Sequence, residues 1–161
     1  MEKGTVNSLE RSTKKGTRVK YKPFDQRLHD ECDPPAREAV ARWLKNLWYI
    51  DALPYPDKYA VDLVLSLKGE HIGYAEVEVR DWEFCPFNTI HIAQRKEKLF
   101  THPRTTMYVV NRPLTHAYWI RANKIKDCPL IEVPNRAVAK DEYFYDVPKD
   151  LWKVVDLTEL F

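Results

Sequence analysis

Three acidic residues, Asp62, Glu76 and Glu78, have the types and the spacing of a divalent-metal site. Carboxylate oxygens are the ligands that hard cations such as Mg²⁺ prefer in proteins. Asp62 precedes Glu76 by fourteen positions, and one residue separates Glu76 from Glu78. The three side chains form one site only if the chain brings them to the same face of one element or of two neighbouring elements.

The alternation of residue types around these acids predicts two β-strands. In residues 61–67 one face carries Val61, Leu63, Leu65 and Leu67, and the other carries Asp62, Val64 and Ser66. In residues 71–80 Ala75, Val77 and Val79 share one face, and Tyr74, Glu76, Glu78 and Arg80 share the opposite one. The intervening Lys-Gly-Glu loop is short and contains a glycine, which is typical of a β-hairpin.

The register of this hairpin decides whether the acids meet. If Leu67 pairs with His71, Asp62 lies directly opposite Glu76, and the Cβ atoms of such a pair lie about 4.5–5.5 Å apart. Like charges at this separation destabilise a sheet, and a bound Mg²⁺ compensates for their repulsion. We therefore predict a metal site here, the alternative being a solvated sheet face with scattered charges.

The composition indicates one folded domain. A chain of 161 residues with 44% hydrophobic residues is long and apolar enough to bury a core. Its four glycines form neither a Walker loop nor a dinucleotide fingerprint, which disfavours nucleotide cofactors. Its three cysteines lack the spacing of a zinc site or a disulfide framework. With no long apolar run, we expect a cytoplasmic protein in a reducing compartment.

Positive charge is concentrated in two segments. Residues 1–27 contain eight Lys or Arg against three acids, and residues 91–125 contain seven against one. Two basic segments on either side of an acidic hairpin suit a phosphate-bearing polymer, although a solvated surface is the alternative. We interpret residues 1–27 as a basic arm and residues 28–161 as a single domain.

The remaining elements follow from capping, periodicity and breakers. A helix is expected from Asp33, with Pro34 and Pro35 in its first turn and an apolar stripe at helical spacing behind them. The C-terminal third is expected to contribute loops and short strands that cover the sheet. The other expected elements are a proline-rich turn at 53–57, a loop at 81–88, an extended segment at 90–92, a helix at 94–100, and strands at 106–111 and 117–121.

Asp62, followed by Glu76-x-Glu78 on the next strand, a basic helix and a further strand, resembles the PD-(D/E)XK nuclease superfamily over roughly residues 34–121. The resemblance implies an α/β fold with a mixed sheet, the restriction-endonuclease-like αβββαβ core. It implies Mg²⁺-dependent cleavage of phosphodiester bonds, with Mn²⁺ as a substitute metal. Asp62 and Glu76 are then the metal ligands, with the Val77 carbonyl as a third.

The chain departs from that superfamily at Glu78, where a lysine is usual; a few type II restriction enzymes also have glutamate there. Glu78 would accept a proton from the attacking water or bind a second metal. Alternatively, the lysine has moved to the following helix, where Lys96 or Arg95 points back across the sheet. Both Glu78 and Lys96 are therefore candidate catalytic residues.

The expected activity is a metal-dependent endonuclease acting on double-stranded DNA, site-specific and of the restriction or homing type. Arg95, Lys96 and Lys98 would bind phosphates without reading sequence, and cutting both strands favours a homodimer or higher oligomer. The main alternative is a catalytically inactive nucleic-acid-binding protein with the same fold. A glycosidase using Glu76 and Glu78 is disfavoured, because two residues so close on one strand leave little room for a sugar.

Overall fold

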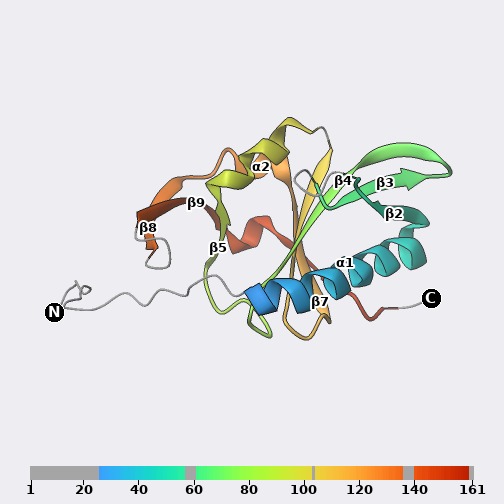
Figure 1. Cartoon of the computed structure of the whole chain (residues 1–161), viewed down its shortest axis with the longest axis horizontal. Coiled ribbons are helices and arrows are strands. Elements are labelled where there is room, and N and C mark those ends of the chain that lie inside the picture. The colour runs from blue at the N-terminus through green and yellow to red at the C-terminus, as the bar shows by residue number, and fades with distance from the viewer. Residues whose placement is uncertain (1–25, 57–60, 103, 136–139, 160–161) are drawn as a thin grey trace. The chain divides into compact units, whose positions relative to one another are not determined.

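The structure is a computed structural model that describes residues 26–56, 61–102, 104–135 and 140–159. The expected basic arm, residues 1–27, lies almost entirely outside the described residues. The elements that carry the site belong to one compact unit, residues 25–133 and 142–161. In chain order (Figure 1) the elements are α1 (Gln26–Trp48), β2 (Ile50–Pro54), β3 (Leu63–Leu67), β4 (Glu70–Val79), β5 (Thr89–Ala93), η1 (Gln94–Thr101), β6 (Thr105–Val110), β7 (His116–Arg121), α2 (Ala122–Ile125), β8 (Leu130–Asn135), β9 (Lys140–Pro148), η2 (Lys149–Leu151) and β10 (Lys153–Asp156).

The main sheet has six strands in the order β10-β7-β6-β4-β3-β2. Strands β4 and β6 are parallel, and every other neighbouring pair in this sheet is antiparallel. A second sheet has the order β5-β9-β8. The expectation of an α/β protein with a mixed sheet is confirmed. None of the helices in the described part of the chain has the length and apolar character needed to cross a bilayer.

Helix α1 begins earlier than the sequence indicates. It starts at Gln26, so Pro34 and Pro35 lie inside the helix and the predicted start at Asp33 is wrong. Prolines favour the first turn of a helix without fixing it there. The predicted apolar stripe is confirmed: Val40, Trp43 and Leu44 are buried, and Leu47 packs against the same cluster.

The hairpin of β3 and β4 forms as predicted, with a different turn. Its loop consists of Lys68 and Gly69, both at positive φ (53° and 80°), as in the type I′ turns that suit two-residue hairpins. Leu67 consequently pairs with Glu70, and the predicted Leu67–His71 pair is wrong. A register shift between Leu65 and Ser66 then sets Leu63 opposite Ala75, which makes Asp62 level with Glu76 as expected.

Strand β2 replaces part of the proline-rich turn expected at 53–57. It pairs with β3 at the edge of the sheet, with Ile50 opposite Leu67 and Pro54 opposite Leu63. Proline lacks the N–H that an interior strand must donate, so it is tolerated at the end of an edge strand.

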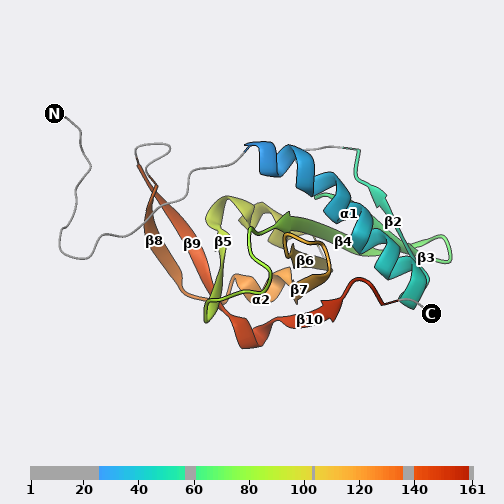
Figure 2. The same cartoon turned by 90° about the horizontal axis from the view of Figure 1, so that it is seen from below.

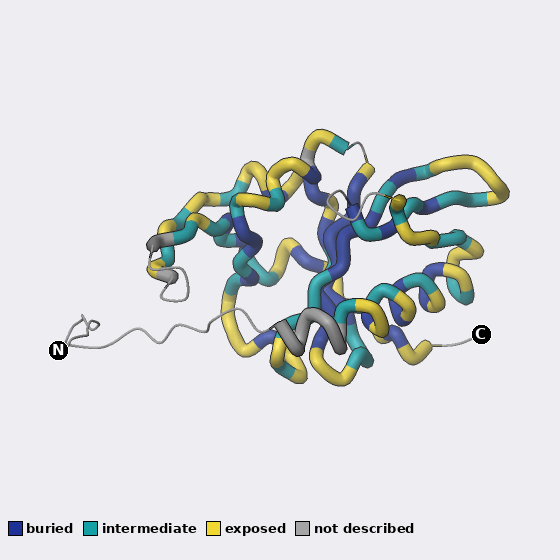
Figure 3. The backbone as a smooth tube through the Cα atoms, viewed as in Figure 1, coloured by how far each residue is buried: buried dark blue, intermediate teal, exposed yellow. Residues whose placement is uncertain are grey.

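Two hydrophobic clusters lie on opposite faces of the main sheet. On one face, α1 packs against alternate residues of β4, including Ala75 and Val77 (Figures 1 and 2). On the other, Met107 and Val109 of β6 contact a cluster that includes Ile92 of β5. The buried segments gather at the central strands (Figure 3). The intervening residues of β4, Glu76 among them, therefore face away from α1.

Candidate active site

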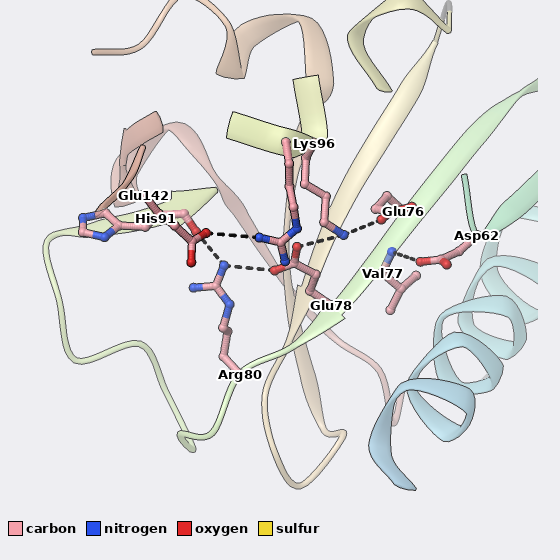
Figure 4. Close-up of polar contacts among 9 residues, drawn as sticks. Asp62, Glu76, Val77, Glu78, Arg80, His91, Lys96 and Glu142 are labelled. Carbon is pink, nitrogen blue, oxygen red and sulfur yellow. Dashed lines mark hydrogen bonds and ion pairs between the residues drawn. The ribbon is translucent and has the colours of Figure 1, made fainter. Parts of the chain in front are cut away.

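Strand β4 and the residue that follows it, Arg80, place three charged side chains on the sheet face opposite α1. Ala75 and Val77 point toward α1, so alternation turns Glu76, Glu78 and Arg80 to the opposite face. Figure 4 shows these three side chains on one side of β4, with Lys96 reaching toward the two glutamates from η1. The predicted shared face of Glu76 and Glu78 is thus present.

The helical type of η1 explains why Lys96 points inward. Residues 94–101 form a 3₁₀-helix, in which side chains three residues apart share a face. Leu99 is buried, and Lys96, three residues earlier, is directed the same way with its side chain only 19% exposed. Arg95 and Lys98 share the outer face and are exposed.

Lys96 joins the two glutamates through its ammonium group. Its Nζ lies 2.5 Å from Glu76 Oε2 and 3.1 Å from Glu78 Oε2. The other oxygen of Glu78 accepts a hydrogen bond from Arg80 Nη2 at 3.0 Å. The same Arg80 nitrogen donates to the His91 carbonyl at 2.6 Å, which anchors this network to β5. The result is an alternating row of negative and positive groups along β4.

Asp62 lies at the edge of β4, immediately before the first residue of β3. Its Oδ2 accepts a hydrogen bond from the Val77 N–H at 2.8 Å (Figure 4). The reason is local: β3 begins at Leu63, opposite Ala75, so Val77 has no strand partner on that side. Because the N–H and C=O of one extended residue point to the same edge, the Val77 carbonyl faces the Asp62 side as well.

The electrostatics differ sharply between the two glutamates. Burial, together with the negative charges of Asp62 and Glu78, raises the pKa of Glu76 to about 7, even though Lys96 acts to lower it. Burial acts the same way on Glu78, but Lys96 and Arg80 outweigh it and lower its pKa to about 2. Although burial opposes its charge, the two glutamates hold the pKa of Lys96 well above its usual range. At neutral pH Lys96 is therefore a cation and Glu78 an anion.

One carboxylate oxygen of Glu76 lacks a hydrogen-bond partner among the described residues. This atom, Oε1, is buried, although Oε2 contacts Lys96. A buried carboxylate oxygen without a partner is costly, and each such atom calls for an explanation. A cation beside this oxygen would provide one.

The expected cluster of three carboxylates is not formed as such. Among the described residues, no group of three His, Cys, Asp or Glu side chains is arranged to hold a metal, and the Lys96 ammonium contacts both Glu76 and Glu78. A smaller donor set remains: Glu76 Oε1, the Asp62 carboxylate and the Val77 carbonyl. Magnesium is commonly held by one or two carboxylates plus water and substrate phosphate, so this set fits it.

The two other basic residues of η1, Arg95 and Lys98, are exposed. The Arg95 side chain is 68% exposed, and its Nη1 lies 3.4 Å from Glu142 Oε1 on β9. The structure therefore brings Lys96, and neither Arg95 nor Lys98, to the glutamates of β4.

Sequence analysis did not identify Arg80 as a site residue. Arg80 binds Glu78 and is only 28% exposed in its side chain. The signal was present in the alternation, since Arg80 is the next residue on the face of Glu76 and Glu78. A cation two residues beyond an acid on the same face of a strand is a candidate ion-pair partner.

Comparison with known proteins identifies no relative: no family model, no curated protein and no solved structure matches the chain.

Proposed function

We propose that this protein is a Mg²⁺-dependent endonuclease that hydrolyses phosphodiester bonds of DNA. The observation that carries the proposal is the state of Glu76, a buried carboxylate on β4 with one oxygen on Lys96 and the other without a hydrogen-bond partner among the described residues. The Asp62 carboxylate, from the residue just before β3, accepts a hydrogen bond from the adjacent Val77. Two carboxylates from neighbouring segments and an inward-facing lysine are the groups that metal-assisted phosphoryl chemistry requires.

The order of the elements supports the same proposal. Helix α1, three antiparallel strands, a helical segment and a strand parallel to the third one follow each other along the chain, as in the restriction-endonuclease-like core. The strands of that core would be β2, β3, β4 and β6, adjacent in the sheet in this order. Strand β5, which belongs to the second sheet, would be an addition between the third strand and the helix.

In this proposal Lys96 takes the role of the superfamily lysine. Its ammonium stays charged and is fixed by two carboxylates, so it would stabilise the negative charge that develops on the phosphoryl group. The low pKa of Glu78 makes it a poor proton acceptor at neutral pH. We therefore assign Glu78 to positioning Lys96 and Arg80, in preference to the direct role expected from sequence.

Asp62 and Glu76, with the Val77 carbonyl, would hold the metal. Bound Mg²⁺ would supply polarisation of the phosphate and a lower pKa for water. Arg95 and Lys98, on the outer face of η1, would bind flanking phosphates and fix the position of the DNA without specifying its sequence. Site specificity on double-stranded DNA and a homodimeric assembly belong to the same proposal.

The test is incubation of a supercoiled plasmid of mixed sequence with purified protein and Mg²⁺ or Mn²⁺. Wild type is expected to nick or linearise the plasmid, and Asp62→Asn, Glu76→Gln and Lys96→Met are expected not to. Glu70→Gln is the matched control, because Glu70 lies on the same strand but is exposed at the turn. Cleavage that survives in Glu76→Gln contradicts the proposal.

One observation favours a second candidate, a DNA-binding protein without catalysis. The Lys96 ammonium already contacts both Glu76 and Glu78, so a metal is not the only cation available to this cluster. This candidate predicts salt-sensitive DNA binding by wild type and by all three variants, with cleavage by none.

A further inference from the structure

A cavity of about 220 Å³ adjoins the site at the end of β4. Its lining includes Arg80 and His91, two aromatic side chains of the loop after β4, Trp82 and Phe87, and Thr89 at the start of β5. Arg80 lines the cavity and also binds Glu78, so the cavity adjoins the row of charged side chains on β4. Arg80 follows Glu78 by two residues and Glu76 by four, so along the strand direction the cavity begins about 6.5 Å from Glu78 and about 13 Å from Glu76.

The loop that forms this cavity is held by hydrogen bonds despite its irregular backbone. The Trp82 carbonyl accepts from the Arg112 N–H at 3.0 Å, and the Cys85 N–H donates to the Tyr118 hydroxyl at 3.2 Å. The Cys85 carbonyl accepts from Lys149 Nζ at 3.1 Å. The cavity is therefore preformed and would not have to be assembled by a ligand.

The lining combines flat apolar rings with unused hydrogen-bonding groups. Trp82 is fixed by an edge-to-face contact with Tyr118 at 5.5 Å between ring centroids, whereas Phe87 is 61% exposed. Both side-chain hydrogen bonds of Arg80 to described residues use Nη2, so the other N–H groups of its guanidinium remain for a ligand. His91 contacts Asp146 through Nε2, which leaves Nδ1.

Aromatic faces together with an arginine and a few hydrogen-bonding groups are the means by which proteins hold an unstacked nucleobase. The cavity is smaller than the roughly 300–1,000 Å³ of sites for drug-sized ligands, which suits a single ring system. A paired base inside a duplex has both its faces and its pairing edge occupied, so only an unpaired or extruded base would enter.

We propose that this cavity, defined by Arg80, Trp82, Phe87, Thr89 and His91, binds one unpaired nucleobase of the DNA strand, a short distance along the strand from the scissile phosphate. The proposal rests on the proposed function and specifies its substrate: DNA with a nucleotide that is unpaired, or that the enzyme extrudes, within a few nucleotides of the cleavage position. Arg80 would link the two sites, because it contacts Glu78 on one side and lines the base cavity on the other.

The test is equilibrium binding in the presence of EDTA, measured by fluorescence anisotropy. The probes are a labelled single-stranded oligothymidylate and an abasic oligonucleotide of the same length and charge. Wild type is expected to bind the oligothymidylate about tenfold more tightly, the scale of one base stacking on an aromatic side chain. Phe87→Ala is expected to lose most of this difference.

Phe84→Ala is the matched control. Phe84 lies on the same loop and is similarly exposed (52%), but it packs against His116 and does not line the cavity. It is expected to keep the wild-type preference for base-bearing DNA. Equal affinity of wild type for the two oligonucleotides, or equal effects of Phe84→Ala and Phe87→Ala, overturns the base site.

Plasmid cleavage in Mg²⁺ separates this inference from the proposed function. Cleavage by wild type, combined with equal affinity for the two oligonucleotides, retains the nuclease and refutes the base cavity. A base preference that is lost in Phe87→Ala, without cleavage by wild type, retains the cavity as a base site and refutes the nuclease.

Discussion

The ammonium nitrogen of Lys96 lies 2.5 Å from Glu76 Oε2, across twenty residues of sequence and between two different elements of the fold. This contact joins η1 to β4, and the second oxygen of Glu76 is buried without a partner in the part of the chain that the structure describes. The site is consequently under electrostatic strain that should be measurable through stability as well as through activity.

Glu76→Gln should alter the pH dependence of stability. The pKa of Glu76 is raised from 4.5 to about 7 in the folded protein, so its contribution to stability is present below pH 4.5 and is lost as the pH rises through 7. In EDTA the melting temperature of wild type should therefore fall relative to that of Glu76→Gln between pH 5 and 8, by about 5 °C. Glu78 does not contribute in this window, because its pKa is lowered and its stabilisation is lost only below pH 4.5. If the melting temperatures of the two proteins change with pH in parallel, the prediction is refuted.

Magnesium should stabilise wild type in the absence of DNA. A ligand that binds only the folded state raises the free energy of unfolding with its concentration. We expect millimolar Mg²⁺ to raise the melting temperature of wild type and of Glu70→Gln, but not that of Asp62→Asn or Glu76→Gln. Calorimetric titration with the metal alone provides the second measurement. Equal shifts in all four proteins would show that the metal binds elsewhere.

Lys96→Met should slow catalysis strongly and also weaken the fold. It leaves two poorly exposed carboxylates without their shared cation, and breaking such a buried pair costs about 3–5 kcal/mol. In single-turnover cleavage at saturating protein we expect a loss of about 10²–10³-fold in rate.

Lys98→Met is the control for Lys96→Met, since Lys98 lies on the same helix and is exposed. It should weaken DNA binding and reduce the slope of log K against log salt concentration by about one unit. At saturating protein its cleavage rate should be close to that of wild type. A similar loss of cleavage rate in the two variants would argue against a special role for Lys96.

Gly73→Ala should destabilise the centre of the main sheet. A Cβ at Gly73 would lie 2.5 Å from the Arg104 carbonyl oxygen, a backbone atom that bonds the Tyr74 N–H at 3.2 Å. We expect a loss of about 2 kcal/mol or more in urea denaturation. Gly69→Ala is the comparison: Gly69 has φ +80° but no atom within 4 Å of a new Cβ, so backbone strain of about 1 kcal/mol is its main cost. A smaller effect at Gly73 than at Gly69 would contradict this argument.

The hairpin and its acids could be predicted because their signals are local. Alternation of apolar and polar residues fixes the face of Glu76, and a register near the turn suffices to bring Asp62 level with it. The predicted turn is one residue too long, and the register shift between Leu65 and Ser66 compensates for that difference. No pattern in the sequence predicts such a register shift.

The orientation of Lys96 and the contribution of Arg80 depend on contacts between distant segments. A basic helix at 94–100 was expected, but its 3₁₀ form decides that Lys96 and not Arg95 faces the carboxylates. The raised pKa of Glu76 likewise depends on burial by several elements. Strand β10, which forms one edge of the main sheet, was anticipated only as one of several short strands in the C-terminal third.

The register shift inside the hairpin has a consequence for how this chain tolerates change. The register shift at residues 65–66 lies between the two-residue turn and the end of β3 that adjoins Asp62. Sequence variation at the hairpin tip should therefore be absorbed before it reaches Asp62. Homologous chains should differ most at the hairpin tip, Lys68 and Gly69, and least in the pairing of Leu63 with Ala75.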